Sequence, residues 1–216
     1  MTGWGEYVAA WAVFLLTHAV PVQRPVKLWL VECLGHASFW LTYSLLSIVV
    51  LAWMIEAAAR APFVELWPRA EWQNHVTLTT MALACLILSL AVFRPNPFSF
   101  GGWRNDDFDP ERPGIVGLVR HPVLAALALW ALGHLAPNGD IAHVVMFGGF
   151  LAFSVFGMAM IDRRHQHSMG SELWQRLRPR RIPHDIANPV RWLAAAMALA
   201  GLIVLHPLVI GLPAVW

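Results

Sequence analysis

The chain has 216 residues and a net charge of +2, and 58% of its residues are hydrophobic while 13% are charged. Because soluble domains carry about 25% charged residues, this composition, with twelve tryptophans, excludes an ordinary soluble domain and indicates an integral membrane protein. The net charge is small and the basic residues form no continuous patch, so no nucleic acid is expected as a partner. Cys33 and Cys85 form no CxxC motif and are expected to be small, buried apolar residues.

Six apolar runs, each long enough to span or nearly span a bilayer, follow one another along the chain. They cover approximately residues 4–22, 37–59, 72–93, 122–136, 141–161 and 190–212. No positive segment precedes the first run and no cleavage site follows it, so we expect a retained span rather than a signal peptide. The sequence Asn138-Gly139-Asp140 combines a helix stop with a helix cap, which predicts a tight hairpin between the fourth and fifth runs.

The basic residues predict how these runs cross the membrane. The first, third and fifth loops contain 13 of the 15 Lys and Arg residues, and the opposite side contains only Arg60 and Arg69. Because basic loops stay in the cytoplasm, we expect an all-α, polytopic membrane helical bundle of about six transmembrane helices with both termini periplasmic. Residues 1–216 would form a single integral-membrane domain, which crosses the lipid bilayer several times.

Three ionisable residues near the ends of spans have simple structural explanations. Glu56 lies four residues before Arg60, which favours an interfacial ion pair. His143 lies in the first turn of the fifth run, where water reaches its ring. His206 precedes Pro207 and is expected to donate to a backbone carbonyl that the proline leaves without a partner. None of the three is expected to carry chemistry.

Three further histidines, His18, His75 and His134, lie within three different apolar runs. Ionisable residues inside a membrane are costly and mark functional sites, and neutral imidazole is the commonest metal ligand in proteins. No carboxylate or second thiolate accompanies them at metal-binding spacing, so a zinc or di-iron site is not expected. A haem suits them better, because it needs only axial ligands and apolar walls. The alternative is that all three are structural.

The motif Arg120-His121-Pro122 opens the fourth run. Proline at the first helical position places His121 at the helix cap, where unpaired N–H groups and partial positive charge favour an anion. The motif predicts a cytoplasmic site for a phosphate or carboxylate of a substrate or cofactor, with Arg163 and Arg164 as further candidates. The alternative occupants are a lipid headgroup or an acidic residue of the third loop, namely Asp106, Asp107, Asp109 or Glu111.

The fifth loop, DRRHQHSMGSELWQRLRPRRIP, has the spacing of an amphipathic helix. Its apolar side carries Leu173, Trp174 and Leu177, and its basic side carries Arg176, Arg178, Arg180 and Arg181. This pattern favours a helix that lies on the membrane surface. The alternative is a lid over Arg120 and His121.

Several segments of the chain resemble the NnrU family of bacterial membrane proteins. They are RPNPFSFGG, PERPGIVGLVRHPVLAALALWALGHLAPNGD and GMAMIDRRHQHSMGSELW, together with FLLTHAVP of the first run and YSLLS of the second. The resemblance extends to about residue 183, and RHP and LGHLAPNGD are its most specific parts. It implies a multi-pass protein of the bacterial inner (cytoplasmic) membrane. It also implies a role in denitrification, for which family members are needed in the expression or activity of nitrite and nitric oxide reductases.

The family in turn looks like a relative of the plant 15-cis-zeta-carotene isomerase, a membrane haem b protein. The RHP, LAH and DRR patterns of that enzyme match residues 120–122, 132–134 and 162–164, with Gly133 in place of alanine. The resemblance implies a haem b cofactor and a redox or isomerase-like reaction in the bundle.

By the same resemblance, His18 and His134 are the axial ligands of the haem iron. The predicted helix directions, at a rise of about 1.5 Å per residue, separate the two rings by roughly 10 Å in depth. His75 is predicted to lie nearer the depth of His134. His134 is therefore the firmest ligand, with His18 as its partner by resemblance or His75 by depth.

Two other hypotheses compete with haem binding. RHP followed by a basic segment resembles isoprenylcysteine and phospholipid methyltransferases, in which the corresponding histidine helps to bind S-adenosylmethionine. The glutamate of the following helix and the tyrosine-rich stretch of those enzymes are not matched, since the chain has only Tyr7 and Tyr43. On the RHP motif alone, the second hypothesis is methyl transfer at Arg120 and His121. The third is a non-enzymatic assembly factor for nitrite or nitric oxide reductase.

Overall fold

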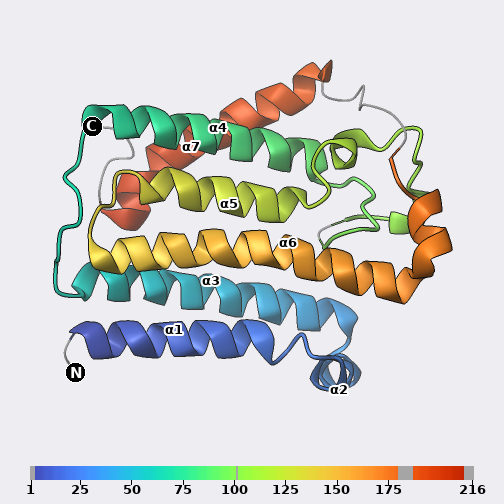
Figure 1. Cartoon of the computed structure of the whole chain (residues 1–216), viewed down its shortest axis with the longest axis horizontal. Helices are drawn as coiled ribbons and strands as arrows, with labels where there is room; N and C mark the ends of the chain where they lie inside the picture. Colours follow the sequence, from blue (N-terminus) through green and yellow to red (C-terminus); the bar gives the residue numbers. More distant parts are fainter. Residues whose placement is uncertain (1–2, 101, 180–186, 212–216) are drawn as a thin grey trace. The chain divides into compact units, whose positions relative to one another are not determined.

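The computed structural model describes residues 3–100, 102–179 and 187–211, and over these residues it contains seven α-helices and no β-strand (Figure 1). The α-helices are α1 (Gly3–Ala19), α2 (Arg24–Leu34), α3 (His36–Arg60), α4 (Glu71–Ala91), α5 (Pro122–Leu135), α6 (Ile141–Arg176) and α7 (Pro189–Ile210). Two short 3-10 helices, η1 (Asn105–Asp107) and η2 (Gly114–Gly117), lie between α4 and α5. Six of the seven α-helices coincide with the predicted apolar runs, so the all-α fold is confirmed.

Four helices, α3, α4, α6 and α7, are long and apolar enough to cross a bilayer. The α1–α2 pair is bent by 79° and counts as a fifth candidate span if it is taken together. Helix α5 is apolar but has only 14 residues. Four to five candidate spans establish a multi-pass helical protein suited to a lipid bilayer, while six spans and periplasmic termini stay predictions. The fifth-loop residues Arg180 and Arg181 lie outside the described residues.

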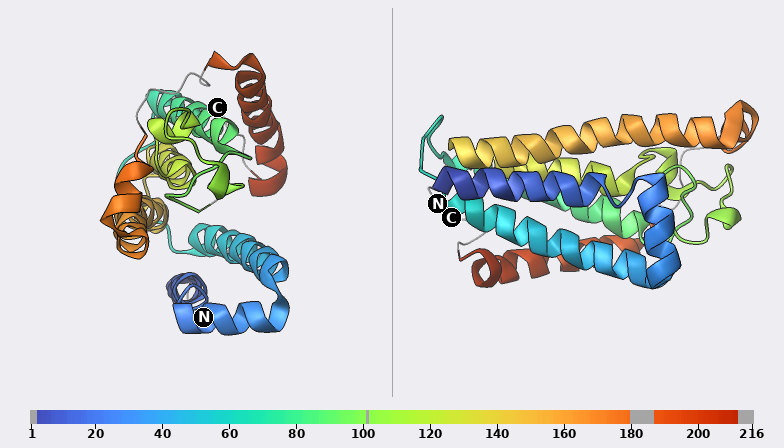
Figure 2. Two further views of the ribbon diagram at one scale, coloured as in Figure 1. Left: turned by 90° about the vertical axis from the view of Figure 1, so that its right-hand side faces the viewer. Right: turned by 90° about the horizontal axis from the view of Figure 1, so that it is seen from below.

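The chain divides into two compact units, Met1–Trp67 with Asp140–Met146 and Pro68–Gly139 with Phe147–Trp216. In the first unit, α1 lies beside α3 and α2 runs across their end (Figure 2). Tyr7 and Phe14 of α1 are buried in this unit, and the Tyr7 hydroxyl donates to the carbonyl of Ala142 at 2.7 Å. The predicted pair of Arg60 with Glu56 is confirmed, and Arg60 also pairs with Glu6 of α1.

Helix α2 was not expected from the sequence, because its segment mixes Arg24, Lys27 and Glu32 with apolar residues and is too short to span a bilayer. A chain bend of 79° separates it from α1. The expectation that both cysteines are buried is wrong for Cys33, which is exposed on this helix, and right for Cys85. A cysteine on a helix that packs along one side only is exposed when it falls on the other side.

In the second unit, α4 packs against both α5 and α7. Gly133 sets the distance between α4 and α5, because a Cβ at this position would lie closer than 3.0 Å to the Thr80 hydroxyl. The Thr77 hydroxyl uses this close approach to donate to the carbonyl of Gly133 at 2.8 Å. At the other contact, Arg191 of α7 donates to the carbonyl of Ser89 at 2.7 Å, near the end of α4. A positive side chain is favourable there because it meets the negative end of the helix dipole.

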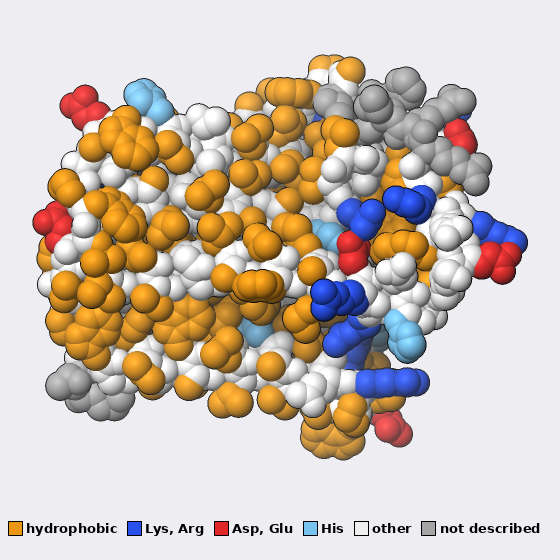
Figure 3. All heavy atoms as spheres, in the orientation of Figure 1, with side chains coloured by type: hydrophobic (Ala, Val, Ile, Leu, Met, Phe, Trp, Pro, Cys, Tyr) orange, Lys and Arg blue, Asp and Glu red, His pale blue; other side chains and the backbone are white. Residues whose placement is uncertain are grey.

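Arginines of the second unit gather at the end where α4 finishes, α5 begins and the later turns of α6 lie. This arginine-rich end includes Arg94, Arg104, Arg112, Arg120, Arg163, Arg164 and Arg176. Basic side chains group visibly at this end in Figure 3, whereas the helix sides are mainly hydrophobic. Helix α6 breaks at Gly170, whose φ of 77° is readily adopted only by glycine. The break turns the last part of α6 away from the direction of the span.

Candidate functional site

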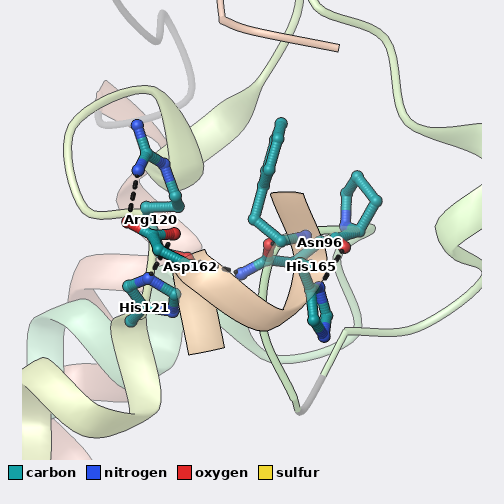
Figure 4. Close-up of polar contacts among 7 residues, drawn as sticks. Asn96, Arg120, His121, Asp162 and His165 are labelled. Carbon is teal, nitrogen blue, oxygen red and sulfur yellow. Dashed lines mark hydrogen bonds and ion pairs between the residues drawn. The ribbon is translucent and has the colours of Figure 1, made fainter. Parts of the chain in front are cut away.

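Arg120, His121 and Asp162 form a polar cluster at the arginine-rich end (Figure 4). The Arg120 guanidinium donates to one Asp162 oxygen at 2.6 Å, and His121 Nε2 lies 3.0 Å from the other. His121 is the N-cap of α5, as predicted, followed by Pro122 in the first turn. Asp162 comes from α6 and lies 41 residues after His121, so its carboxylate ties the start of α5 to α6.

The loop between α4 and α5 holds the backbone of this cluster in place through hydrogen bonds. The Asn96 side-chain amide donates to the carbonyl of Arg120 at 2.9 Å, and its Oδ1 accepts from Phe98 N at 3.0 Å. Asn105 Oδ1 accepts in turn from Asn96 N at 2.9 Å. Gly102 is required for this packing, because a Cβ there would lie closer than 3.0 Å to both asparagines. The RPNPF segment therefore positions the backbone that carries Arg120.

Two aromatic rings enclose the guanidinium of Arg120. Phe98, 1% exposed, meets Trp174, 8% exposed, edge to face at a centroid distance of 5.1 Å. The guanidinium carbon lies 5.4 Å from the Trp174 ring and 5.8 Å from the Phe98 ring, within the range of cation–π attraction. Leu177 packs against the buried apolar side chains of Phe98 and Trp174, whereas Leu173 is 46% exposed. Trp174 and Leu177 therefore pack against the protein, whereas the membrane-surface helix and the lid both stay predictions.

His121 is 5% exposed, and its burial favours the neutral ring. Burial lowers its pKa below the ordinary value of 6.5, and it outweighs Asp162, which favours the charged ring. The charges of Arg120 and His165 act in the same direction as burial. Because a carboxylate only accepts, the ring proton is on Nε2, and Nδ1 carries the lone pair. Among the residues that the structure describes, Nδ1 has no hydrogen-bond partner, although it is fully buried.

The acidic partner of Arg120 differs from the candidates in the third loop. Asp107 pairs with Arg104 at 2.9 Å, and Asp109 accepts from the backbone N–H of Glu111. The sequence carried a signal for Asp162 in the DRR pattern, but nothing in the pattern showed that its carboxylate faces Arg120. Arg163 and Arg164, the next two residues, are exposed. The anion site predicted for Arg120, His121, Arg163 and Arg164 stays a prediction.

His134 lies in the last turn of α5, in an aromatic environment. Its Nδ1 lies 2.8 Å from the carbonyl of Trp130, and its ring centroid is 5.3 Å from those of Trp130 and Phe147. The His206 ring of α7 lies 6.5 Å away at an interplanar angle of 24°. The structure thus brings His134 together with a histidine that sequence reasoning had given a purely structural role. Two histidines 72 positions apart carry no spacing signal that could have paired them.

The other two candidate ligands have different surroundings. His75 is exposed on α4. His18 belongs to the first unit, where its Nδ1 lies 2.8 Å from the carbonyl of Phe14 and its ring stacks on Phe14 at 4.1 Å. Over the described ranges, no group of three or more His, Cys, Asp or Glu side chains is arranged to hold a metal ion by itself. The haem ligand pair stays a prediction.

The chain belongs to the NnrU family, because the sequence model of that family, described as NnrU protein, matches residues 6–214. The match covers nearly the whole chain, including α7, whose sequence carries little of the resemblance seen in the earlier segments. No curated protein and no solved structure matches the chain.

Proposed function

We propose that this NnrU protein binds haem b within the membrane, with His134 as an axial ligand of the iron. The observation that carries the proposal is the hydrogen bond from His134 Nδ1 to the carbonyl of Trp130. A carbonyl only accepts, so the ring proton is on Nδ1 and Nε2 offers its lone pair. Metal-ligating histidines are commonly oriented in this way by their other ring nitrogen. The rings of Trp130 and Phe147 supply the apolar walls that a macrocycle needs.

Two histidines are candidates for the second axial position. The His206 ring lies 6.5 Å from that of His134, and two imidazoles bound to one metal ion at about 2 Å each have ring centroids about 6 Å apart. His18, the partner by resemblance, shares with His134 the hydrogen bond from Nδ1 to the carbonyl four residues before it. His75, the partner suggested by depth, is exposed on α4.

A bound haem b would supply redox chemistry at its iron or polarise a substrate, which suits a redox or isomerase-like reaction in the bundle. The residues of the chain would hold the iron through imidazole nitrogens and keep water away with Trp130, Phe147 and Phe150. The cellular role proposed for this protein in the bacterial inner membrane is support of nitrite and nitric oxide reductases during denitrification.

A visible absorption spectrum of the detergent-purified protein, expressed with ample haem, tests the proposal. We expect a Soret band that His134→Ala abolishes. Either His206→Ala or His18→Ala removes or shifts the band, which identifies the second ligand, and His75→Ala leaves it unchanged. His167→Ala is the matched control, because His167 is exposed on the later part of α6. Absence of a Soret band in the wild-type protein would contradict the proposal.

Complementation separates an enzyme from an assembly factor. A strain deleted for the gene is expected to grow poorly on nitrite without oxygen, and the wild-type gene restores growth. If haem chemistry is the function, His134→Ala fails to restore it. Full restoration by alanine at His18, His75 and His134 supports the non-enzymatic assembly factor instead.

Calorimetry with S-adenosylhomocysteine tests the methyltransferase hypothesis, which predicts heat of binding that His121→Ala removes.

A further inference from the structure

The buried face of His121 has an unmet hydrogen-bonding requirement. Nε2 is engaged with Asp162 at 3.0 Å, whereas Nδ1 is buried without a partner in the part of the chain that the structure describes. Buried polar atoms in folded proteins are almost always hydrogen-bonded, and an exception calls for an explanation such as a ligand or an ordered water. The side chain is 5% exposed, so bulk solvent does not supply the partner.

The charge balance around His121 determines what kind of partner fits. Arg120 is positive, Asp162 is negative and they are paired at 2.6 Å, while the imidazole is neutral. The cluster therefore has no net positive charge with which to hold an anion. Nδ1 is an acceptor and requires a hydrogen-bond donor. Because Arg120 and Asp162 cancel each other, a charged donor gains nothing over a neutral one, and a neutral hydroxyl or amide N–H is the best match.

A small cavity lies beside the start of α5. Its volume is about 40 Å³, and its lining includes Asn96, Val116, Pro122 and Val123. This volume holds a water molecule but is too small for most organic ligands. His121 is not among the residues that line it, so a ligand at Nδ1 needs the surrounding residues to move.

The last part of α6 and the residues after it can provide that movement. We define residues 171–177 as the strap. It follows the backbone break at Gly170, whose φ is 77°. Its anchors are Trp174, which is buried together with Phe98, and Leu177, which packs against them. Gly170 and Leu173 are exposed, so the strap has one packed side only. A hinge glycine beside a segment with few anchors is typical of a lid.

We propose that His121 Nδ1 accepts a hydrogen bond from a hydroxyl or amide N–H of a neutral ligand, which enters at the arginine-rich end when the strap lifts from Arg120. In this site Asp162 fixes the tautomer of His121, and Arg120 neutralises Asp162. The strap then closes with Trp174 over Arg120. The site is separate from the histidine pair of α5 and α7, and the inference is independent of haem.

Two substitutions separate the ring nitrogens. His121→Gln retains a side-chain N–H that reaches Asp162 but lacks an acceptor at the Nδ1 position, whereas His121→Asn retains an acceptor near Nδ1 and does not reach Asp162. If Nδ1 serves a ligand, His121→Gln melts within about 2 °C of the wild-type protein, and His121→Asn melts at a clearly lower temperature. If His121→Gln melts as low as His121→Ala, the Nδ1 atom is needed by the fold and the proposal is overturned.

The deciding measurement is a structure of the full chain, purified from native membranes without extensive washing, at a resolution that shows ordered water. We expect density larger than a water molecule within hydrogen-bonding distance of Nδ1, and we expect it to be lost in His121→Gln. A single water or no density at Nδ1 overturns the proposal. Ligand density that persists unchanged in His121→Gln also overturns it, because Nδ1 would then not hold the ligand.

Discussion

The second unit carries a histidine at each end of α5, and the two rings are anchored by opposite nitrogens. His134 is held through Nδ1 by the carbonyl of Trp130, four residues before it in the same helix. His121 is held through Nε2 by the carboxylate of Asp162, from another helix. The anchor decides which nitrogen remains for chemistry: Nε2 at the aromatic end and Nδ1 at the arginine-rich end. The two ends can therefore be damaged separately.

Removal of the tryptophan at the arginine-rich end is expected to have the largest effect. Trp174→Ala removes the ring packed on Phe98 and over Arg120, and large-to-small substitution of a packed aromatic residue costs about 3 kcal/mol or more. Thermal unfolding in detergent measures the loss. Leu173→Ala is the control, because Leu173 is 46% exposed and should change the melting temperature little. Equal melting temperatures for the two variants would contradict the packing of Trp174 on Phe98 and Arg120.

Loss of the carboxylate comes next in size. Asp162→Ala leaves Arg120 without its ion pair and His121 Nε2 without its acceptor, and a hydrogen bond to a charged group contributes about 2 kcal/mol. Asp162→Asn keeps an oxygen acceptor and should lose less. Thermal unfolding of both variants measures the difference. The spectrum of any bound haem should stay as in the wild type, and a change would show that the two ends are coupled.

A methyl group at Gly133 is expected to disturb the aromatic end instead. Gly133→Ala forces a Cβ against the Thr80 hydroxyl, and overpacking of this kind costs about 1–3 kcal/mol. Gly148→Ala is the matched control, since its Cβ would enter open space within the same unit. Unfolding temperatures are compared for the two variants and for Gly133→Ala combined with Thr80→Ala, which should restore stability. No recovery in the double variant would place the strain elsewhere.

The smallest expected effect is on the pH dependence of stability, and it belongs to His121. Its pKa in the folded protein is lowered chiefly by burial, so the unfolded chain binds the proton more readily. The stabilisation is fully present above about pH 6.5 and is lost as the pH falls through the lower pKa of the folded state. Melting temperatures of the wild type and of His121→Gln from pH 7.5 to below 6 measure it. The variant should lose less stability than the wild type on acidification, and parallel curves would contradict the assignment.

The sequence predicted the parts of this molecule that depend on local patterns. Six helices followed from apolar runs and their caps, and the cap predicted in Asn138-Gly139-Asp140 is present, because Asp140 accepts from His143 N at 3.3 Å. Helix α2 was missed, because it is short and mixes charged with apolar residues. The break at Gly170 was missed as well, because a glycine in an amphipathic pattern does not reveal whether the helix continues.

The candidate site divides in the same way. His121 at its cap followed from the proline after it, and His134 followed from its position in an apolar run. Their partners Asp162 and His206 come from other helices, and their identity depends on how those helices rotate against α5. No spacing in a single sequence encodes that rotation.

The close contact at Gly133 constrains which residues related proteins can carry at this position. It couples the residue at position 133 to the residue at position 80, because the space for one side chain is filled by the other. A homologue with alanine at position 133, as in the LAH pattern, must carry a smaller residue at position 80 or hold α4 and α5 farther apart. Substitutions at the two positions should therefore covary among relatives. Where they do not, the wider separation of the helices would also shift the imidazole that follows position 133.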